Sequence, residues 1–190
     1  MRLKLTTAPA IEPVTLDEAK NHLKIDSSED NSLISALITT ARQLAEKETK
    51  RAFITQTWEM YLDEAREEIE IPKPPLQDVT SIKAIAADGT ETVVDVTTYY
   101  VDKAENSPGR VKLKSGYSWP THRGFASFII RLVCGYGDTA TDVPEPLRQG
   151  ILQLIAYLYE NRGAEKVTTF YPPIPESIKA IFWPWKILRI

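Results

Sequence analysis

Cysteine and histidine are scarce in this sequence of 190 residues. Cys134 is the single cysteine, so the chain can form no internal disulfide and has no cysteine cluster of the kind that holds zinc. The two histidines, His22 and His122, lack the spacing of a helical metal site. We therefore expect no metal and no cofactor, and we interpret His22 as a surface or half-buried side chain.

Long apolar runs are also missing. No stretch of about 18 apolar residues is present, and the opening residues MRLKLTTAPA lack the apolar centre of a secretion signal. The sequence thus predicts a chain made in the cytoplasm, without membrane contact.

Its net charge of −3 provides no basic field to hold nucleic acid. A weakly acidic wall would let a DNA duplex slide past, because it offers few anchors for phosphate groups.

Two amphipathic patterns near the start predict helices. Thr15 and Glu18 form a capping box before a short helix over roughly 16–24. A second, longer helix follows, which Ser27 or Ser28 can cap. Its apolar stripe consists of Leu33, Ile34, Leu37, Ile38, Ala41, Leu44 and Ala45.

A third helix is predicted over 144–162, with Pro144 in its first turn and Gly163 just past its end. This helix is apolar on more than one face, which indicates burial by a neighbouring subunit as well as by its own core. The residues predicted to face that neighbour are Leu152, Ala156 and Tyr159.

Between the helices lie short runs rich in β-branched and aromatic residues, separated by turn signals. The clearest hairpin is IAADGTETVV, and the spacing predicts an antiparallel sheet or small barrel of about five to seven strands. The fold class is therefore α+β, a small helical bundle (two N-terminal helices plus one C-terminal helix) with an inserted β part and an extended C-terminal arm. The predicted boundaries are 1–52 and 143–163 for the helical core, 53–142 for the β domain and 164–190 for the arm.

The C-terminal residues IKAIFWPWKILRI are unusually apolar for the end of a domain, and they include Trp183 and Trp185. A proline-rich lead precedes a short helix that begins at Pro175 or Glu176 and ends at Pro184. Two interpretations remain open. The segment folds back onto its own core, or it carries aromatic anchors for another chain.

Catalytic interpretations find little support in the spacing. A cysteine nucleophile needs a base within hydrogen-bond reach, and nothing in the sequence places His122 beside Cys134, which lies within an apolar run. The stretch CGYGD is too short for a phosphate-binding loop. An enzyme with an unrecognised site remains a minor alternative.

Two charged clusters have ordinary explanations. The acidic run DEAREEIE matches no calcium loop, so a solvated turn or a contact with a basic patch is the better interpretation. It contains Asp63, Glu64, Glu67, Glu68 and Glu70. A basic cluster beside aromatic residues can bind single strands, but a solvated sheet face is favoured here. It contains Lys103, Arg110, Lys112, Lys114 and Arg123.

The ordered set of segments resembles the head–tail connector (adaptor) family of tailed bacteriophages and gene transfer agents. The resemblance rests on PVTLDEAKNHLKI, LISALITTARQLAEKETKRAFITQTWEMYLD, IPKPPLQDVTSIKAIAADGTETVVDVTTYYVD, PGRVKLKSGYSWP, CGYGDTATDVPEPLRQGILQLIAYLYENRG and PESIKAIFWPWKI. It covers most of the chain, and the order of the pieces is more specific than any one of them.

The resemblance implies a structural virion protein of the neck and no enzymatic activity. Such a protein forms a homo-oligomeric ring under the portal protein, a dodecamer, which extends the DNA channel and provides a platform for the stopper or tail-completion protein. Genomic DNA would pass through without sequence-specific binding. The alternative role in the same neck is that of a head-closure (stopper) or tail-terminator protein. The expected location is the virion, after assembly in the host cytoplasm.

In this family the C-terminal segment engages the portal, so the resemblance implies a docking arm over 172–190. The residues expected to bind the portal are Ile178, Ile181, Phe182, Trp183, Trp185, Ile187 and Leu188. The ending WPWKILRI is more apolar than the family's common close, which is basic or contains tyrosine. Deletion of residues 176–190 is then expected to leave the fold intact and to abolish portal attachment.

Overall fold

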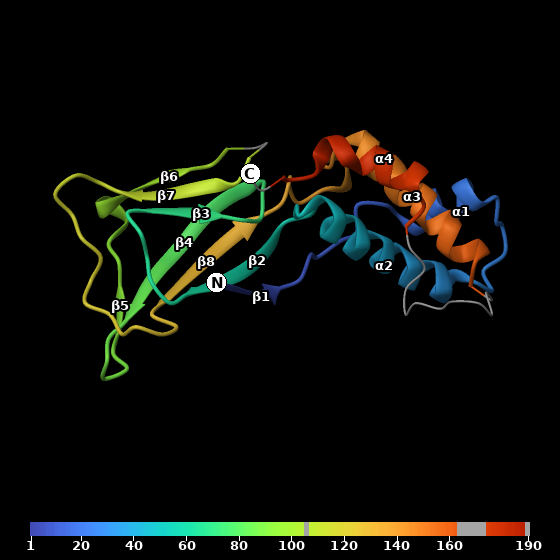
Figure 1. Ribbon diagram of the computed structural model, residues 1–190. Helices are drawn as coiled ribbons and strands as arrows, with labels where there is room; N and C mark the ends of the chain where they lie inside the picture. Colours follow the sequence, from blue (N-terminus) through green and yellow to red (C-terminus); the bar gives the residue numbers. More distant parts are fainter. Residues whose placement is uncertain (105–106, 163–173, 189–190) are drawn as a thin grey trace. The chain divides into compact units, whose positions relative to one another are not determined.

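The computed structural model describes residues 1–104, 107–162 and 174–188 (Figure 1). The chain forms two compact units. The sheet unit comprises residues 1–10 and 55–136, and the helical unit comprises residues 11–54 and 137–190. Antiparallel sheets and α-helices are thus segregated, and the predicted α+β class is confirmed.

The sheet unit contains a five-stranded and a three-stranded antiparallel sheet (Figure 1). The five-stranded sheet has the order β1 (Arg2–Thr7), β2 (Gln56–Leu62), β8 (Phe128–Cys134), β4 (Leu76–Ile85) and β5 (Glu91–Val93). The three-stranded sheet has the order β3 (Glu68–Ile71), β7 (Gly109–Leu113) and β6 (Tyr99–Asp102), and a short 3-10 helix, η1 (Val96–Thr98), precedes β6. Within the described residues both sheets are open, so the small barrel considered as an alternative is not formed.

The register of the five-stranded sheet places its core residues in one row. Met60 of β2 faces Ile130 of β8, which faces Ile82 of β4, and all three side chains are fully buried. Such rows of apolar side chains on one face are what fixes the register of a sheet. The predicted hairpin is also confirmed: β4 and β5 pair across a turn in which Gly89 adopts a positive φ of 87°.

Strand β1 was not expected from the sequence, which assigned residues 1–52 to the helical core. In the structure β1 pairs antiparallel with β2, and residues 1–10 therefore belong to the sheet unit. Five of its six side chains are exposed. An edge strand of this kind has no buried face to produce a clear alternating pattern.

The first two helices follow the expected order. Helix α1 (Leu16–Leu23) begins with the predicted capping box of Thr15 and Glu18. Helix α2 (Asn31–Thr49) begins later than predicted: Asp30 is its N-cap residue, and neither Ser27 nor Ser28 occupies that position.

The C-terminal half of the helical unit contains η2 (Ala140–Asp142), α3 (Glu145–Glu160), α4 (Glu176–Phe182) and η3 (Trp183–Trp185). The predicted start of the short helix at Glu176 is confirmed, but α4 ends at Phe182, and Pro184 lies within η3. The predicted stop at Gly163 lies outside the described residues. The buried face of α3 consists of Leu147, Gly150, Ile151, Leu154 and Ile155. No helix among the described residues is long and apolar enough to cross a membrane.

Candidate functional site

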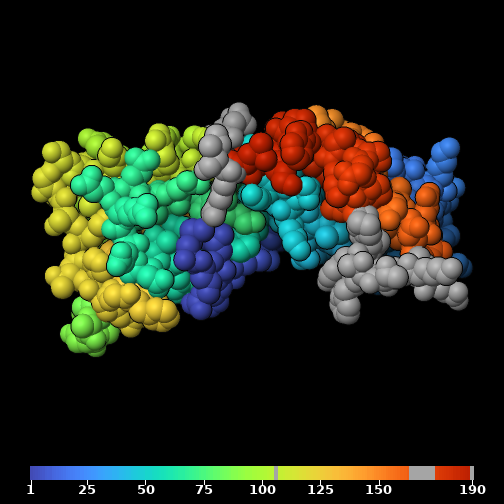
Figure 2. Space-filling model, viewed as in Figure 1, coloured from blue at the N-terminus to red at the C-terminus, as the bar shows by residue number. Residues whose placement is uncertain are grey.

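The C-terminal segment packs along the helical unit. Figure 2 shows residues 174–188 (red) lying against α3 (orange) and the end of α2 (cyan), and α4 contacts both helices. Three of its apolar side chains are buried there: Ile178, Phe182 and Ile187, with exposed fractions of 5%, 0% and 8%. These residues belong to the core of the helical unit.

A glycine in the middle of α3 permits this close packing. A Cβ atom at Gly150 would lie 2.7 Å from Cε1 of Phe182, which is closer than real side chains approach. Because glycine in a helix costs about 1 kcal/mol relative to alanine, its presence here indicates a packing requirement. This interior glycine was a signal in the sequence for the contact, although it does not name the partner residue.

Polar contacts fasten the same segment to the end of α2. The Nε atom of Arg51 donates to the carbonyl oxygen of Trp185 at 2.6 Å, and the amide of Ile187 donates to the carbonyl oxygen of Thr49 at 3.0 Å. Lys186 forms an ion pair of 2.7 Å with Glu48. We name these three contacts the C-terminal clasp. Sequence reasoning missed it, because its two sides are far apart in the chain.

The opposite side of the segment faces solvent. The side chains of Trp183 and Leu188 are each 61% exposed, and those of Ile181 and Trp185 are half-buried. A shallow pocket of about 580 Å³ lies beside Trp183. It is lined by Glu48, Glu176, Lys179, Ala180, Trp183 and Lys186. The pocket together with Leu188 is called the arm surface below.

The two lysines of the arm surface are held by carboxylates. Lys179 and Glu176 form an ion pair of 2.7 Å, and this hydrogen bond raises the pKa of Lys179. Lys186 is paired with Glu48 and lies 5.7 Å from the centre of the Trp183 ring. The arm surface therefore presents one large exposed aromatic ring, Trp183, surrounded by paired charges.

The second apolar face of α3, which the sequence predicted to contact a neighbouring subunit, is only partly exposed to solvent. Leu152 and Ala156 are half-buried. Tyr159 is also half-buried, its hydroxyl donates to the carboxylate of Asp30, and the guanidinium of Arg162 stacks 4.1 Å from its ring centre. Tyr159 thus connects α3 with the start of α2 in its own unit.

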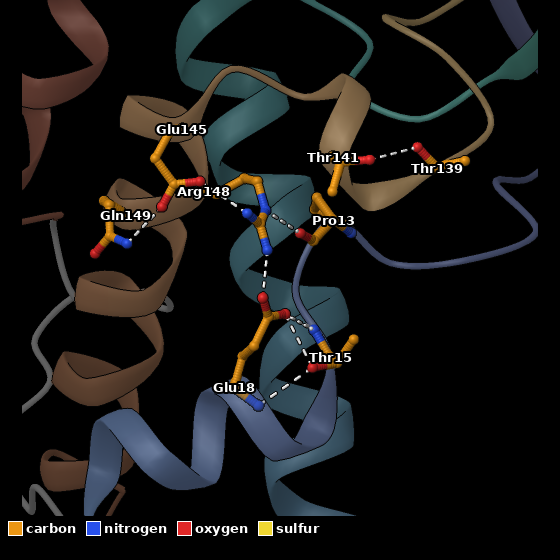
Figure 3. A network of polar contacts seen from close by, with 8 residues as sticks. All are labelled: Pro13, Thr15, Glu18, Thr139, Thr141, Glu145, Arg148 and Gln149. Carbon is orange, nitrogen blue, oxygen red and sulfur yellow. Dashed lines mark hydrogen bonds and ion pairs between the residues drawn. The ribbon is translucent and has the colours of Figure 1, made fainter.

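Arg148 joins the starts of α3 and α1 (Figure 3). Its Nε atom donates to the carbonyl oxygen of Pro13 at 3.0 Å, and its two other nitrogens form ion pairs with Glu145, at 2.7 Å, and with Glu18. The amide of Thr15 donates to Glu18 at 2.8 Å. The pKa of Glu18 is lowered, first by this backbone hydrogen bond and also by Arg148. These contacts of Arg148, Pro13, Glu145, Glu18 and Thr15 hold the starts of the two helices together, and we name them the clamp.

The structure separates the candidate catalytic pair. The ring of His122 lies 4.7 Å from that of Phe128, which begins β8, while Cys134 ends the same strand six residues later. A strand of that length spans about 20 Å, so no hydrogen bond can join the two. Burial also raises the pKa of the Cys134 thiol to about 12. The cysteine–histidine interpretation is therefore wrong.

Metal ligation finds no support in the described part of the chain, where no three His, Cys, Asp or Glu side chains are grouped to hold an ion. The acidic run is dispersed by the fold. Asp63 accepts a hydrogen bond from the amide of Ala126 at 2.9 Å, and Glu68 pairs with Arg110 at 3.3 Å.

Three of the five side chains in the basic cluster pair with carboxylates, and the other two donate to backbone carbonyl oxygens. Lys103 pairs with Asp78 at 2.9 Å, and Arg110 pairs with Asp102 at 2.8 Å as well as with Glu68. Lys112 lies 3.9 Å from Glu68, the amino group of Lys114 donates to the carbonyl oxygen of Thr97, and Arg123 donates to that of Ala126. This arrangement supports the interpretation of a solvated, ion-paired sheet face.

Comparisons with solved structures find chains of the same fold in assembled particles. A chain from the neck of an empty gene transfer agent (GTA) particle, computed with C6 symmetry, is 20% identical, with a TM-score of 0.84. A chain from the virion of a native GTA particle is 21% identical with a TM-score of 0.81, and one from the neck of a native GTA particle computed with C12 symmetry is 21% identical with a TM-score of 0.76. Each match covers 100% of this chain and 97% of the other.

No curated protein matches the sequence. A family model does, over residues 13–186, and it describes the phage gp6-like head-tail connector proteins. The match spans both units, from just before α1 to the clasp residue Lys186. The chain belongs to the phage gp6-like head-tail connector protein family.

Proposed function

We propose that the protein is a structural component of the neck of a virion, where it forms the connector (adaptor) ring under the portal. The observation that carries this proposal is the extent of the likeness: the family model spans residues 13–186, and the fold matches chains of GTA necks over 97% of their length. Those necks were computed with C6 and C12 symmetry, and both are compatible with a ring of twelve copies.

The arm surface is the proposed contact with the portal. Of the seven residues expected from the sequence, Ile178, Phe182 and Ile187 are buried in the protein's own core and would reach a partner only if the clasp opened. The outward side chains of Trp183 and Leu188 are available without any rearrangement, with Ile181 and Trp185 beside them. Exposed aromatic anchors of this kind carry much of the energy of protein interfaces.

The ring also needs contacts between its copies, a channel for DNA and a platform for the next protein. Leu152 and Ala156 on α3 are proposed to contact a neighbouring copy, with Tyr159 at the border of that contact. Genomic DNA would pass through the channel without sequence-specific binding, in keeping with the net charge of −3 and with the ion pairs of Lys103 and Arg110. A platform for the stopper or tail-completion protein would lie on the side away from the portal.

Binding to the portal protein of the same particle tests the docking contact. Deletion of residues 176–190 is unsuitable, because it removes Phe182 from the core. We instead expect the double substitution Trp183→Ala and Leu188→Ala to weaken portal binding about tenfold or more, with an unchanged melting curve. Phe125→Ala in the sheet unit, where Phe125 is 76% exposed, is the matched control. Equal portal binding by the natural sequence, the double variant and Phe125→Ala would refute the docking contact.

Electron cryo-microscopy of the neck separates the proposed role from its alternatives. A ring of this chain in direct contact with the portal supports the connector. A ring separated from the portal by another protein would contradict it and would favour a head-closure (stopper) or tail-terminator role.

A further inference from the structure

The two edge strands of the five-stranded sheet carry opposite charges. Strand β1 lies at one edge and contributes Arg2 and Lys4, with no acidic residue before Glu12. Strand β5 lies at the other edge. It and its flanking turns contribute three carboxylates, Asp88, Glu91 and Asp95, of which Glu91 is offset by Lys83 at 2.8 Å.

The register places these charges on one face of the sheet. A single row of paired residues crosses all five strands: Arg2, Tyr61, Ile129, Lys83 and Val93. Because side chains alternate between the two faces, residues two positions away share the same face. Lys4 on β1 and Glu91 on β5 therefore project from the face that carries Arg2 and Val93.

The backbone of β5 is open toward its outer side. Hydrogen bonds from Ala86 to Thr90, at 2.9 Å, and from Val94 to Ile82, at 2.8 Å, mark the bonded pairs of the β4–β5 ladder. In an antiparallel ladder the residues between such pairs turn their amide and carbonyl groups away from the partner strand. Glu91 and Val93 thus present these groups at the edge, where another strand can pair with them.

Each edge also carries an exposed apolar side chain. Leu5 on β1 is 41% exposed, and Val93 on β5 is 62% exposed. By the register given above, Val93 shares the face of Glu91, whereas Leu5 lies on the opposite face from Lys4.

We propose that the β5 edge of one copy binds the β1 edge of the next copy, so that the five-stranded sheets of neighbouring subunits adjoin around the ring. This inference rests on the ring proposed above. The contact is head-to-tail, because each copy uses two different edges, and head-to-tail contacts are those that generate closed rings. Alternation along the antiparallel sheet gives β1 and β5 the same direction, so the pairing between copies is parallel.

Charge reversal in the full-length chain tests this contact. Lys4→Glu and Glu91→Lys are made separately and together, and the mass of the assembly is measured by light scattering and sedimentation over a range of concentrations. Each single variant places like charges opposite each other and is expected to raise the dissociation constant of self-association about tenfold or more. The double variant restores opposite charges at every contact and is expected to recover the assembly.

Val93→Pro provides a second test that does not depend on charge. Proline is tolerated on an edge strand where its missing N–H would face outward, so the β4–β5 hairpin is kept while pairing with another strand is blocked. We expect this variant to lose the assembly with an unchanged circular dichroism spectrum. Lys47→Glu, at an exposed position of α2, is the control with the same change in charge as Lys4→Glu.

Recovery by the double variant, together with loss in the single variants and in Val93→Pro, supports the edge contact. The edge contact is overturned if all variants assemble like the natural sequence, or if that sequence stays monomeric at the highest concentration. Portal binding is measured in a separate experiment. Failure of the edge contact can therefore be distinguished from failure of the proposed connector role.

Discussion

The helical unit and the sheet unit use charged residues in different ways. In the helical unit Arg42 is 8% exposed and lies between Glu12, at 2.7 Å, and Glu46, at 3.0 Å. In the sheet unit the comparable side chain, Arg110, is 54% exposed where it pairs with Asp102. The first joins segments within the core of its unit, and the second lies on a surface.

The difference follows from how each unit is held together. Neighbouring strands are fixed by backbone ladders, so their ion pairs add little. Helices satisfy their backbone groups internally, and long-range polar contacts must come from side chains. Arginine suits this task, because its planar group donates to several acceptors at once. Arg42, Arg51 and Arg148 each connect segments that are distant in the sequence.

A large effect on stability is expected from Arg42→Ala. The substitution leaves Glu12 and Glu46 without the cation between them, and removal of one partner from a buried ionic contact costs about 3–5 kcal/mol. The free energy of unfolding is measured by urea denaturation. Arg131→Ala, which breaks a 3.2 Å pair with Glu59 on the sheet surface, serves as the control. Equal losses in the two variants would contradict the comparison between the units.

A similar contrast exists within the C-terminal segment. Phe182→Ala removes a fully buried ring and is expected to lower the free energy of unfolding by about 3–5 kcal/mol. Trp183→Ala, at the next position, changes an exposed side chain and is expected to cost less than about 1 kcal/mol. Thermal and urea unfolding of the pair check this order. A larger loss for Trp183→Ala would show that the ring is part of the core.

The clamp of Figure 3 predicts a dependence on pH. The pKa of Glu18 is lower in the folded protein, so its contribution to stability is complete above the unfolded pKa of about 4.3 and is lost as the pH falls through the folded value. We expect Glu18→Gln to be less stable than the natural sequence at pH 7, and to lose less stability between pH 5 and pH 3. Urea midpoints measured at each pH provide the check, and parallel curves would argue against the clamp.

The smallest effect is expected from Arg110→Ala. Its ion pairs with Asp102 and Glu68 are exposed to water, where screening and side-chain entropy cancel most of the attraction. The urea midpoint should stay within experimental error of the natural value. A clear decrease would mean that surface charge holds the three-stranded sheet in register.

Local signals predicted local structure well. Thr15 and Glu18 defined the start of α1, the Asp88-Gly89 turn defined the β4–β5 hairpin, and Pro184 indicated within two residues where the α-helical part of the C-terminal segment ends. In each case the cause lies within a few residues, in a cap, a positive φ or a missing amide donor.

Features that depend on distant residues were not predicted. Strand β1 exists because β2 pairs with it some fifty residues later. The clasp joins Arg51 to Trp185, which are 134 residues apart, and no pattern near either residue indicates the other. The C-terminal segment has a buried side and an exposed side, so the two interpretations of its apolar sequence both describe part of it. Apolar composition does not show which side chain turns inward.

The clasp has a consequence for the order in which the chain folds during synthesis. All residues of the sheet unit have been made once residue 136 is added, whereas the helical unit needs Phe182 against Gly150 and Trp185 against Arg51. Domains tend to fold as units while the ribosome is still at work. Helices α1 and α2 therefore stay incompletely covered until residues 174–188 have been made. A copy that lacks residues 174–188 exposes apolar surface of the helical unit, and we expect proteases to remove such a copy before assembly.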